Sequence, residues 1–329
     1  MKKAFFLFSF LLIGLLAIAQ NPCPQVIPAL QEWKGSKGTL HLPAQGSIII
    51  NPSDETALAS TAAILKNDLK ELMGWEYTII TGKAKKDGIY LSLSEPDEQL
   101  GKEGYELSIL NKASIQAPTA QGVFWGTRTL LQMLYRQDAK LAKGTTRDWP
   151  EFPNRGFMLD VGRKFFTLDY LKEQIKVLSF YKMNEFQIHL NDNGFPQFFD
   201  NDWSKTYAAF RLESERFPGL TAKDGSYSKK EFIELQRMGM EYGVNIIPEI
   251  DIPAHSWPLH TTSPKSVQRN TAWITSTSIK KKLTSSSMPC WMNTSLEKNR
   301  FSLLPMCISV RMSTTRKKPN NTDILLTDT

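Results

Sequence analysis

Three apolar runs between Asn154 and Ser256 decide the fold: RGFMLDVGR at residues 155–163, EFQIHLND at residues 185–192 and NIIPEIDIPAH at residues 245–255. Two amphipathic segments, Leu168–Lys182 and Ser228–Tyr242, separate these runs. Alternation of short apolar runs with amphipathic segments is typical of parallel strands joined by helices and buried on both faces. We therefore predict three βα units of a parallel sheet over residues 155–256.

Each apolar run breaks into polar, ionisable residues at its C-terminal end. Arg163 follows the first run, Asp192 ends the second, and Glu249, Asp251 and His255 lie at the end of the third. Charged side chains contribute nothing to the packing of a buried strand, and in a (β/α)₈ barrel the active site lies at the C-terminal ends of the strands. We take these five residues as the candidate site.

A smaller α+β domain is expected upstream, over residues 20–136. Its predicted helices are Glu55–Met73, with apolar residues at helical spacing, and Gly122–Leu134. Its predicted strands are 47–50, 77–80, 88–93 and 105–109. Residues 137–154 are predicted as a linker, because Pro150 and Pro153 prevent a helix there.

Residues 1–19 have the pattern of a secretory signal peptide. Lys2 and Lys3 precede an apolar run that ends in the small-residue pattern Ala17-Ile18-Ala19. The run is short for a spanning helix, which needs ~20 apolar residues, and no later segment is apolar enough to span a bilayer. We expect export to the periplasm or outside the cell, with no membrane span after cleavage.

The charge and the cysteines exclude two classes of function. The net charge is +7, but residues 257–329 contain 11 Lys and Arg against 3 Asp and Glu, which leaves 29 basic against 30 acidic residues in the rest. A nucleic-acid partner is not expected, because such proteins gather basic residues on a folded face. The three cysteines, Cys23, Cys290 and Cys307, have no metal-ligand spacing, and we predict no metal and no cofactor.

The motifs LDVGR (159–163), HLND (189–192) and PEIDIPAH (248–255), in this order, resemble those of the family 20 glycoside hydrolases, the β-N-acetylhexosaminidases. The segment GVFWGTR (122–128) is similar to the end of that family's N-terminal domain. The resemblance covers about residues 24–256. It implies an N-terminal α+β domain followed by a (β/α)₈ TIM barrel, and a glycan partner with terminal, non-reducing β-linked N-acetylglucosamine or N-acetylgalactosamine.

The resemblance also implies roles for the candidate residues. Arg163 matches the arginine that binds hydroxyls of the terminal sugar, a task suited to the fixed donors of a guanidinium. Asp192 and His255 match residues that line the site and support the catalytic acid, and Glu249 and Asp251 belong to the same cluster. The chain departs from the family pattern at Lys164, Asn193 and Ala254. The aromatic residues of the loop over 191–225 are expected mostly to pack in the core, and some to face sugars.

The resemblance implies a substrate-assisted retaining mechanism, in which the 2-acetamido group attacks the anomeric carbon. An aspartate orients that group and the adjacent glutamate is the acid. This Asp-Glu pair is expected after the fourth strand, but Glu297, Asp323 and Asp328 are the only acidic residues of segment 257–329. No catalytic residue can therefore be assigned.

Segment 257–329 contains 23 Ser and Thr and no sustained period, which is typical of a disordered tail. Read one base out of frame from Met306, it permits Val-His-Ile-Gly-Thr-Asp-Glu-Tyr, which contains the missing pair. We hypothesise a frameshift just after Ser256. Three strands cannot close an eight-stranded barrel, so the chain is expected to hold an incomplete barrel and to be inactive.

The sequence leaves three alternatives open. The chain is a non-catalytic carbohydrate-binding remnant, another barrel glycosidase with the same N-terminal domain, or a protein whose basic tail binds nucleic acid. The arginine of LDVGR disfavours the second. Two structural explanations of the candidate residues also stay open: an Asp160–Arg163 ion pair beneath the barrel, and a core histidine at His189.

Overall fold

The structure is a computed structural model that describes residues 20–136, 140–202, 204–215, 217–251, 255 and 257–258. The predicted signal peptide and nearly all of the segment after Ser256 lie outside these residues. The described chain forms two compact units, one from residues up to 157, 169–186 and 235–246, the other from 158–168, 187–234 and the residues from 247 onward.

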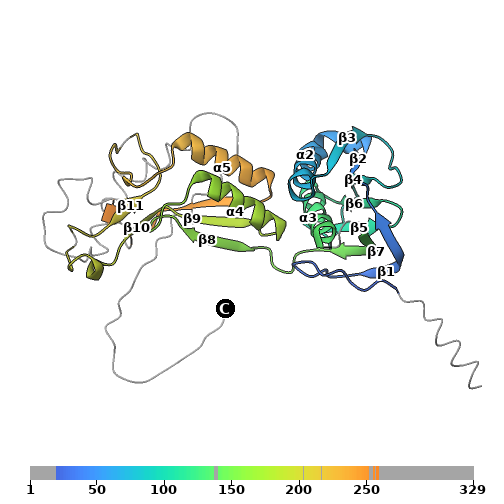
Figure 1. The fold of residues 1–329 in the computed structure, drawn as a ribbon, viewed down its shortest axis with the longest axis horizontal. Helices are drawn as coiled ribbons and strands as arrows, with labels where there is room; N and C mark the ends of the chain where they lie inside the picture. The colour runs from blue at the N-terminus through green and yellow to red at the C-terminus, as the bar shows by residue number, and fades with distance from the viewer. Residues whose placement is uncertain are drawn as a thin grey trace, which may run out of the picture. The chain divides into compact units, whose positions relative to one another are not determined.

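The first unit contains a seven-stranded mixed sheet (Figure 1). The strand order is β1-β7-β5-β6-β4-β2-β3. The bounds are β1 (Lys34–His41), β2 (Gln45–Ile50), β3 (Glu76–Thr81), β4 (Ile89–Leu93), β5 (Tyr105–Ile109), β6 (Ala113–Ala117) and β7 (Lys140–Asp148). Pairs among β2, β3, β4 and β6 are parallel, whereas β5 pairs antiparallel with β6 and β7, and β1 antiparallel with β7.

Helix α2 (Glu55–Met73), which follows the 3₁₀ turn η1 (Pro52–Asp54), confirms the prediction from its apolar spacing. Leu58, Leu65 and Leu69 have no exposed surface. The helix ends at Gly74, whose left-handed backbone (φ 69°) lets its N–H bond to the carbonyl oxygens of Leu69 and Lys70, a conformation that costs glycine little.

Helix α3 (Ala120–Arg136) lies beside α2 against the sheet and is buried from Gly122 through Leu134 (Figure 1). Gly126 brings it close to β5 and β6, because a Cβ there would lie 2.5 Å from Ile115 and 3.0 Å from Tyr105. Arg128 is buried on this helix and pairs with Asp68 of α2. The helix is two residues longer at each end than predicted.

The predicted linker 137–154 is wrong over Lys140–Asp148. These residues are strand β7, which joins β1 to β5 in the sheet. The inward positions include Thr146 and Asp148, so the alternation of apolar and polar residues that marks a strand is obscured. Both polar side chains are buried with partners: Thr146 donates to the carbonyl of Glu32, and Asp148 accepts from the N–H of Gln31 at 3.0 Å.

The predicted βα units are confirmed in the remainder of the chain. They are β8 (Gly156–Asp160), α4 (Leu168–Phe180), β9 (Glu185–His189), α5 (Lys229–Glu241) and β12 (Asn245–Glu249), with strand order β12-β9-β8. Backbone hydrogen bonds pair residues 155 with 184 and 161 with 189, and 184 with 245 and 190 with 249, so the strands run parallel. Three parallel strands joined by helices are the arrangement expected of the first part of a (β/α)₈ barrel.

The predicted capping box opens α5. The side chain of Glu231 accepts from the N–H of Ser228 at 2.7 Å, and the N–H of Glu231 donates to the Ser228 hydroxyl at 3.2 Å. Within the described residues, no helix combines the length and apolar character needed to cross a bilayer.

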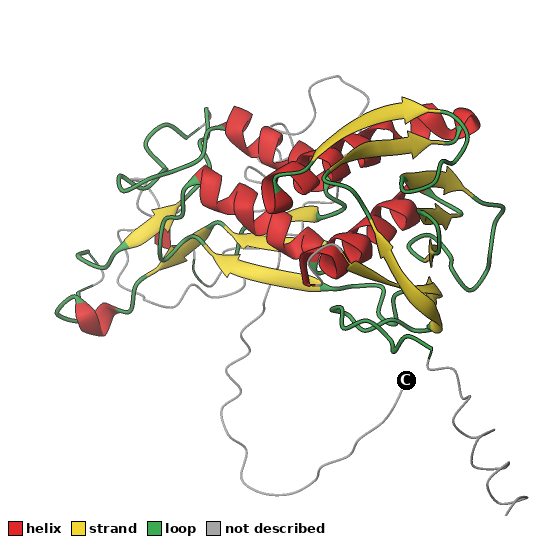
Figure 2. Ribbon diagram, turned by 45° about the vertical axis from the view of Figure 1, so that its right-hand side comes forward, coloured by secondary structure: helices red, strands yellow, loops and turns green. Residues whose placement is uncertain are grey.

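The loop between β9 and α5 is mostly irregular (Figure 2). It contains the hairpin of β10 (Asn191–Asn193) and β11 (Ala208–Phe210), with η2 (Pro196–Phe198) between them. Arg211 is fully buried and holds the turn after β8, because its guanidinium donates to the carbonyls of Val161 (2.7 Å) and Gly162 (2.9 Å) and pairs with Asp224 (2.7 Å). The turn that carries Arg163 is thereby fixed.

A buried ion pair joins the end of α4 to β7 within the first unit. The Lys182 ammonium donates to Asp148 Oδ2 at 2.9 Å and to the Tyr105 hydroxyl at 2.7 Å, and both charged side chains are less than a tenth exposed. Burial lowers the pKa of Lys182, while the carboxylate of Asp148 opposes that shift.

We predict that Lys182→Met lowers the free energy of unfolding by about 3–5 kcal/mol, because it leaves the Asp148 carboxylate buried without its cation. Urea unfolding followed by circular dichroism measures the change. Lys176→Met is the matched control: Lys176 pairs with Glu71 at a more exposed position, so its loss should cost less than about 1 kcal/mol. Equal effects of the two variants would contradict the prediction.

Candidate functional site

The structure brings all five predicted site residues together in the second unit. They surround Asp192, which lies on β10 just after the end of β9. Arg163 comes from the turn after β8, and Glu249, Asp251 and His255 come from the end of β12 and the residues after it. The expectation that polar residues at successive strand ends converge is confirmed for these residues.

Asp192 is the centre of the cluster and has no exposed surface. Its Oδ1 bonds to His255 Nδ1 at 2.7 Å and accepts the backbone N–H of Asn193 at 2.7 Å. Its Oδ2 lies 3.0 Å from His189 Nε2 and 2.8 Å from Arg163 Nη1. Burial alone would raise the pKa of Asp192, but these hydrogen bonds hold it well below its usual range, so Asp192 is a carboxylate.

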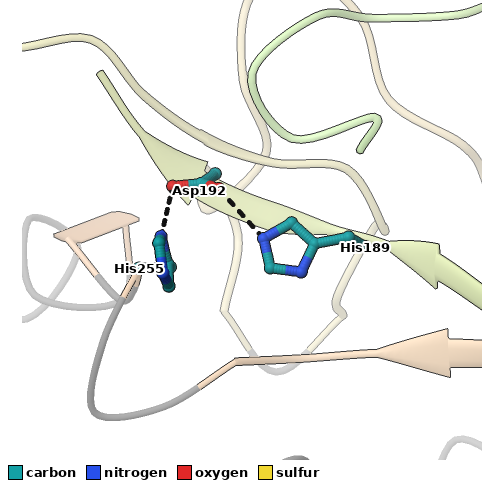
Figure 3. A group of neighbouring side chains, drawn as sticks. All are labelled: His189, Asp192 and His255. Atoms are coloured by element: carbon teal, nitrogen blue, oxygen red, sulfur yellow. Dashed lines mark hydrogen bonds and ion pairs between the residues drawn. The ribbon is translucent and has the colours of Figure 1, made fainter. Parts of the chain in front are cut away.

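His189 bridges two buried carboxylates. Its Nε2 faces Asp192, and its Nδ1 lies 2.9 Å from Glu249 Oε2. Burial by itself would lower the pKa of His189, but the hydrogen bonds and charges of Asp192 and Glu249 raise it to about 9. Figure 3 shows the rings of His189 and His255 both directed at Asp192.

His255 is about one third exposed and has a left-handed backbone (φ 55°), which is uncommon for a residue other than glycine. The side-chain amide of Asn191 donates to the carbonyls of Asp251 (3.0 Å) and His255 (2.8 Å), which fixes this turn. The hydrogen bond to Asp192 raises the pKa of His255.

Asp251 lies behind His255, with its Oδ2 3.6 Å from His255 Nε2. Its Oδ1 is buried and has no hydrogen-bond partner among the described residues. Burial raises the pKa of Asp251. This carboxyl group therefore has bonding capacity that the described part of the chain leaves unused.

Arg163 is the exposed cation of the cluster, with 39% of its side chain accessible. Its Nη1 is shared by Asp160 (2.7 Å) and Asp192 (2.8 Å), its backbone N–H donates to Asp160 Oδ1 (2.9 Å), and its Nη2 lies 3.4 Å from His255 Nδ1. The Phe195 ring lies 5.5 Å away. The guanidinium is thus held in place by carboxylates while one side stays open to solvent.

Sequence reasoning missed two residues. The first is His189, for which the sequence suggested a core histidine. His189 is indeed buried with both ring nitrogens bonded, but its partners are the site residues Asp192 and Glu249. The available signal was its i,i+3 spacing to Asp192 beyond a strand end. Asn191, which holds the turn of His255, carried no signal in the sequence. The Asp160–Arg163 ion pair exists and belongs to the site.

The aromatic residues of the loop divide into two groups. Phe210 is fully buried, as expected for core packing, whereas Phe195 and Phe198 are 53% and 75% exposed and pack edge to face. Trp203 lies outside the described residues. Asn193, a departure from the family pattern, keeps its contact with Asp192 because the contact uses the backbone N–H.

His189, Asp192 and His255 also have the geometry of potential metal ligands. One ligand atom from each of the three residues lies within 4.8 Å of the other two. Among the described residues, these three form the only group of three or more His, Cys, Asp or Glu side chains with this spacing. The chemistry that the cluster offers is thus a fixed guanidinium for hydroxyl groups, a carboxylate–imidazole pair able to hold a proton, and a set of donors for a cation.

Two family models match the chain in succession. Glycosyl hydrolase family 20, domain 2 matches residues 23–149, and glycosyl hydrolase family 20, catalytic domain matches residues 152–302. Among curated proteins, a beta-hexosaminidase of Akkermansia muciniphila is 31% identical over 178 residues, half of this chain. A beta-hexosaminidase of Vibrio furnissii is 32% identical over 219 residues, 61% of this chain.

Solved structures show the same architecture. A mutant Streptomyces plicatus beta-hexosaminidase in complex with its product, GlcNAc, superposes with a TM-score of 0.60 and 26% identity over 72% of this chain. This likeness confirms an N-terminal domain followed by part of a TIM barrel. The chain spans 34% of the length of each of the two curated relatives and 48% of the Streptomyces chain.

We predict that Asp192→Asn lowers the free energy of unfolding by roughly 2–4 kcal/mol, because a neutral amide cannot balance the buried His189 and the guanidinium of Arg163. Thermal and urea unfolding measure the change. Asp200→Asn is the matched control, since the side chain of Asp200 is 80% exposed and its replacement should leave stability unchanged. A stability loss no larger than that of the control would show that the Asp192 charge is not a structural centre.

Proposed function

The chain belongs to glycosyl hydrolase family 20. We propose that it derives from an exported β-N-acetylhexosaminidase. We further propose that residues 1–329 contain the sugar-binding part of the active site but not the catalytic Asp-Glu pair. The substrate is a glycan with a terminal, non-reducing β-linked N-acetylglucosamine or N-acetylgalactosamine. The signal-peptide pattern of residues 1–19 supports export, to the periplasm or outside the cell.

The observation that carries this proposal is the Arg163 guanidinium. Asp160 and Asp192 fix its orientation through Nη1, while the side chain remains partly open to solvent. A rigid fork of donors held in this way suits two neighbouring hydroxyl groups of a sugar ring. GlcNAc is the product bound by the Streptomyces plicatus relative, which supports an N-acetylhexosamine as the ligand.

The proposed reaction is substrate-assisted and retaining. The carbonyl oxygen of the 2-acetamido group attacks the anomeric carbon while a glutamic acid protonates the departing glycosidic oxygen. The resulting glutamate then takes a proton from water, which opens the cyclic intermediate with retention and restores the acid. In this scheme the Asp192–His255 pair holds a proton beside that acid and keeps it oriented. The aspartate and glutamate of the reaction are missing from residues 257–329, whose acidic residues are Glu297, Asp323 and Asp328.

A second candidate is a carbohydrate-binding protein without hydrolytic activity. The partly exposed Arg163 and the exposed rings of Phe195 and Phe198 favour it, because they offer a polar and an apolar contact surface for a sugar without any catalytic carboxylate. Binding and turnover distinguish the two candidates, and each requires a separate measurement.

We predict that the chain releases no detectable p-nitrophenol from p-nitrophenyl N-acetyl-β-glucosaminide. General acid catalysis alone contributes about 10²–10⁴-fold, and the oriented acetamido nucleophile a further ~7–11 kcal/mol, and both depend on the missing pair. Turnover that disappears in Arg163→Ala would contradict this prediction.

The DNA sequence around codon 256 tests the frameshift hypothesis directly. The hypothesis fails if no insertion or deletion there restores the frame that contains the Asp-Glu pair.

We predict that the chain binds N-acetylglucosamine and that Arg163→Ala weakens the binding roughly 10- to 100-fold, the value of a charge-assisted hydrogen bond to a sugar hydroxyl. Isothermal titration calorimetry and saturation-transfer NMR measure it. Arg237→Ala, at an exposed position of α5, is the matched control and should bind as the unaltered chain does. The prediction is wrong if the unaltered chain does not bind N-acetylglucosamine, or if Arg163→Ala and Arg237→Ala bind it with equal affinity.

A further inference from the structure

We propose that His189, Asp192 and His255 form a site for a borderline transition-metal cation, with Zn²⁺ as the representative ion, and that this cation competes with the guanidinium of Arg163. Hydrolysis in the proposed function needs no metal, so the ion is not a cofactor of that reaction. The proposal concerns a second ligand of the cluster and stands independently of sugar binding.

The three ligand atoms come from two segments: His189 and Asp192 lie at and just after the end of β9, and His255 lies after β12. His189 Nε2 and His255 Nδ1 lie 3.0 and 2.7 Å from opposite oxygens of Asp192, and all three ligand atoms lie within 4.8 Å of one another (Figure 3). Zinc bonds of about 2.0–2.2 Å in tetrahedral geometry place ligand atoms roughly 3.3–3.5 Å apart. A shift of about an ångström therefore completes the set, and His255, the more exposed histidine, is free to make it.

Each histidine has a carboxylate behind it. Glu249 bonds to the far nitrogen of His189 at 2.9 Å, and Asp251 lies 3.6 Å from the far nitrogen of His255. Carboxylates in this position orient metal-binding histidines and make their ligating nitrogens more basic. The unused Oδ1 of Asp251, which is 5% exposed as a residue, is a second observation that points to a missing partner on this side of the cluster.

The charge balance also favours a cation. Four carboxylates, those of Asp160, Asp192, Glu249 and Asp251, surround one arginine and two imidazoles, so a cation that replaces the imidazole protons still meets an excess of negative charge. If an ion displaces the guanidinium from Asp192, Arg163 keeps its two contacts with Asp160, at 2.7 and 2.9 Å. Two imidazole nitrogens with one carboxylate oxygen suit Zn²⁺, Cu²⁺, Ni²⁺ or Co²⁺, whereas Mg²⁺ prefers oxygen ligands alone.

The test is a titration of the full chain with ZnCl₂ in the absence of sugar, by calorimetry. The thiols of Cys23, Cys290 and Cys307 are alkylated first, because thiolates bind zinc. We expect one site with a Kd below about 100 μM and no binding of Mg²⁺. His189→Ala and His255→Ala should each abolish this site, and His41→Ala, on β1, should leave it unchanged.

Two further variants distinguish a zinc site from a cluster that only stabilises the fold. Glu249→Gln should weaken zinc binding roughly 10- to 100-fold. Arg163→Ala should strengthen it about 2- to 5-fold by removing the competing cation, the opposite of its expected effect on sugar binding. If His189→Ala does not fold by circular dichroism, His255→Ala, at the more exposed of the two histidines, decides. Zinc binding that survives His255→Ala, or that is absent up to millimolar ZnCl₂ in the unaltered chain, overturns the proposal.

Discussion

The buried carboxylate of Asp192 is the constraint on which the site depends. A charge without exposed surface is stable only when charged or hydrogen-bonding partners surround it, because its desolvation costs several kcal/mol. Asp192 takes its four partners from the turn after β8, the end of β9, the backbone of Asn193 and the segment after β12. Satisfying one carboxylate thus fixes the relative positions of the segments that carry the functional side chains.

The same network of charges costs folding stability but provides oriented charged groups for ligand binding. Every contact of Asp192 is with a cation or a donor, and each of its three side-chain partners has a second carboxylate: Asp160 for Arg163, Glu249 for His189 and Asp251 for His255. An apolar residue at the end of β9 would cost far less to bury. Polar clusters of this kind persist where a binding site requires oriented charges.

Sequence reasoning placed the elements well because their signals are local. Helix α2 follows from its apolar spacing, the start of α5 from the Ser228–Glu231 capping box, and the three parallel strands from their apolar runs. Strand β7 was missed because its inward residues include Thr146 and Asp148, which are tolerated only through partners distant in sequence. The five candidate residues were found from their places at strand ends, and the i,i+3 spacing of His189 to Asp192 is a local signal for one of its contacts. No local pattern shows that His189 also binds Glu249, 60 residues away, or that Asn191 holds the turn of His255.

The contacts within the first unit indicate how part of an incomplete barrel is held in place. Eight strands normally stabilise one another by closing the barrel, and the described sheet has three. The end of α4 is instead attached to the α+β domain: Gln132 of α3 donates to the carbonyl of Phe180 at 2.7 Å, and Lys182 is buried against Asp148 and Tyr105. At the entrance to β8, Arg155 pairs with Glu103. These bonds use residues of the first βα unit and of the α+β domain only, so they do not require the later strands of a closed barrel.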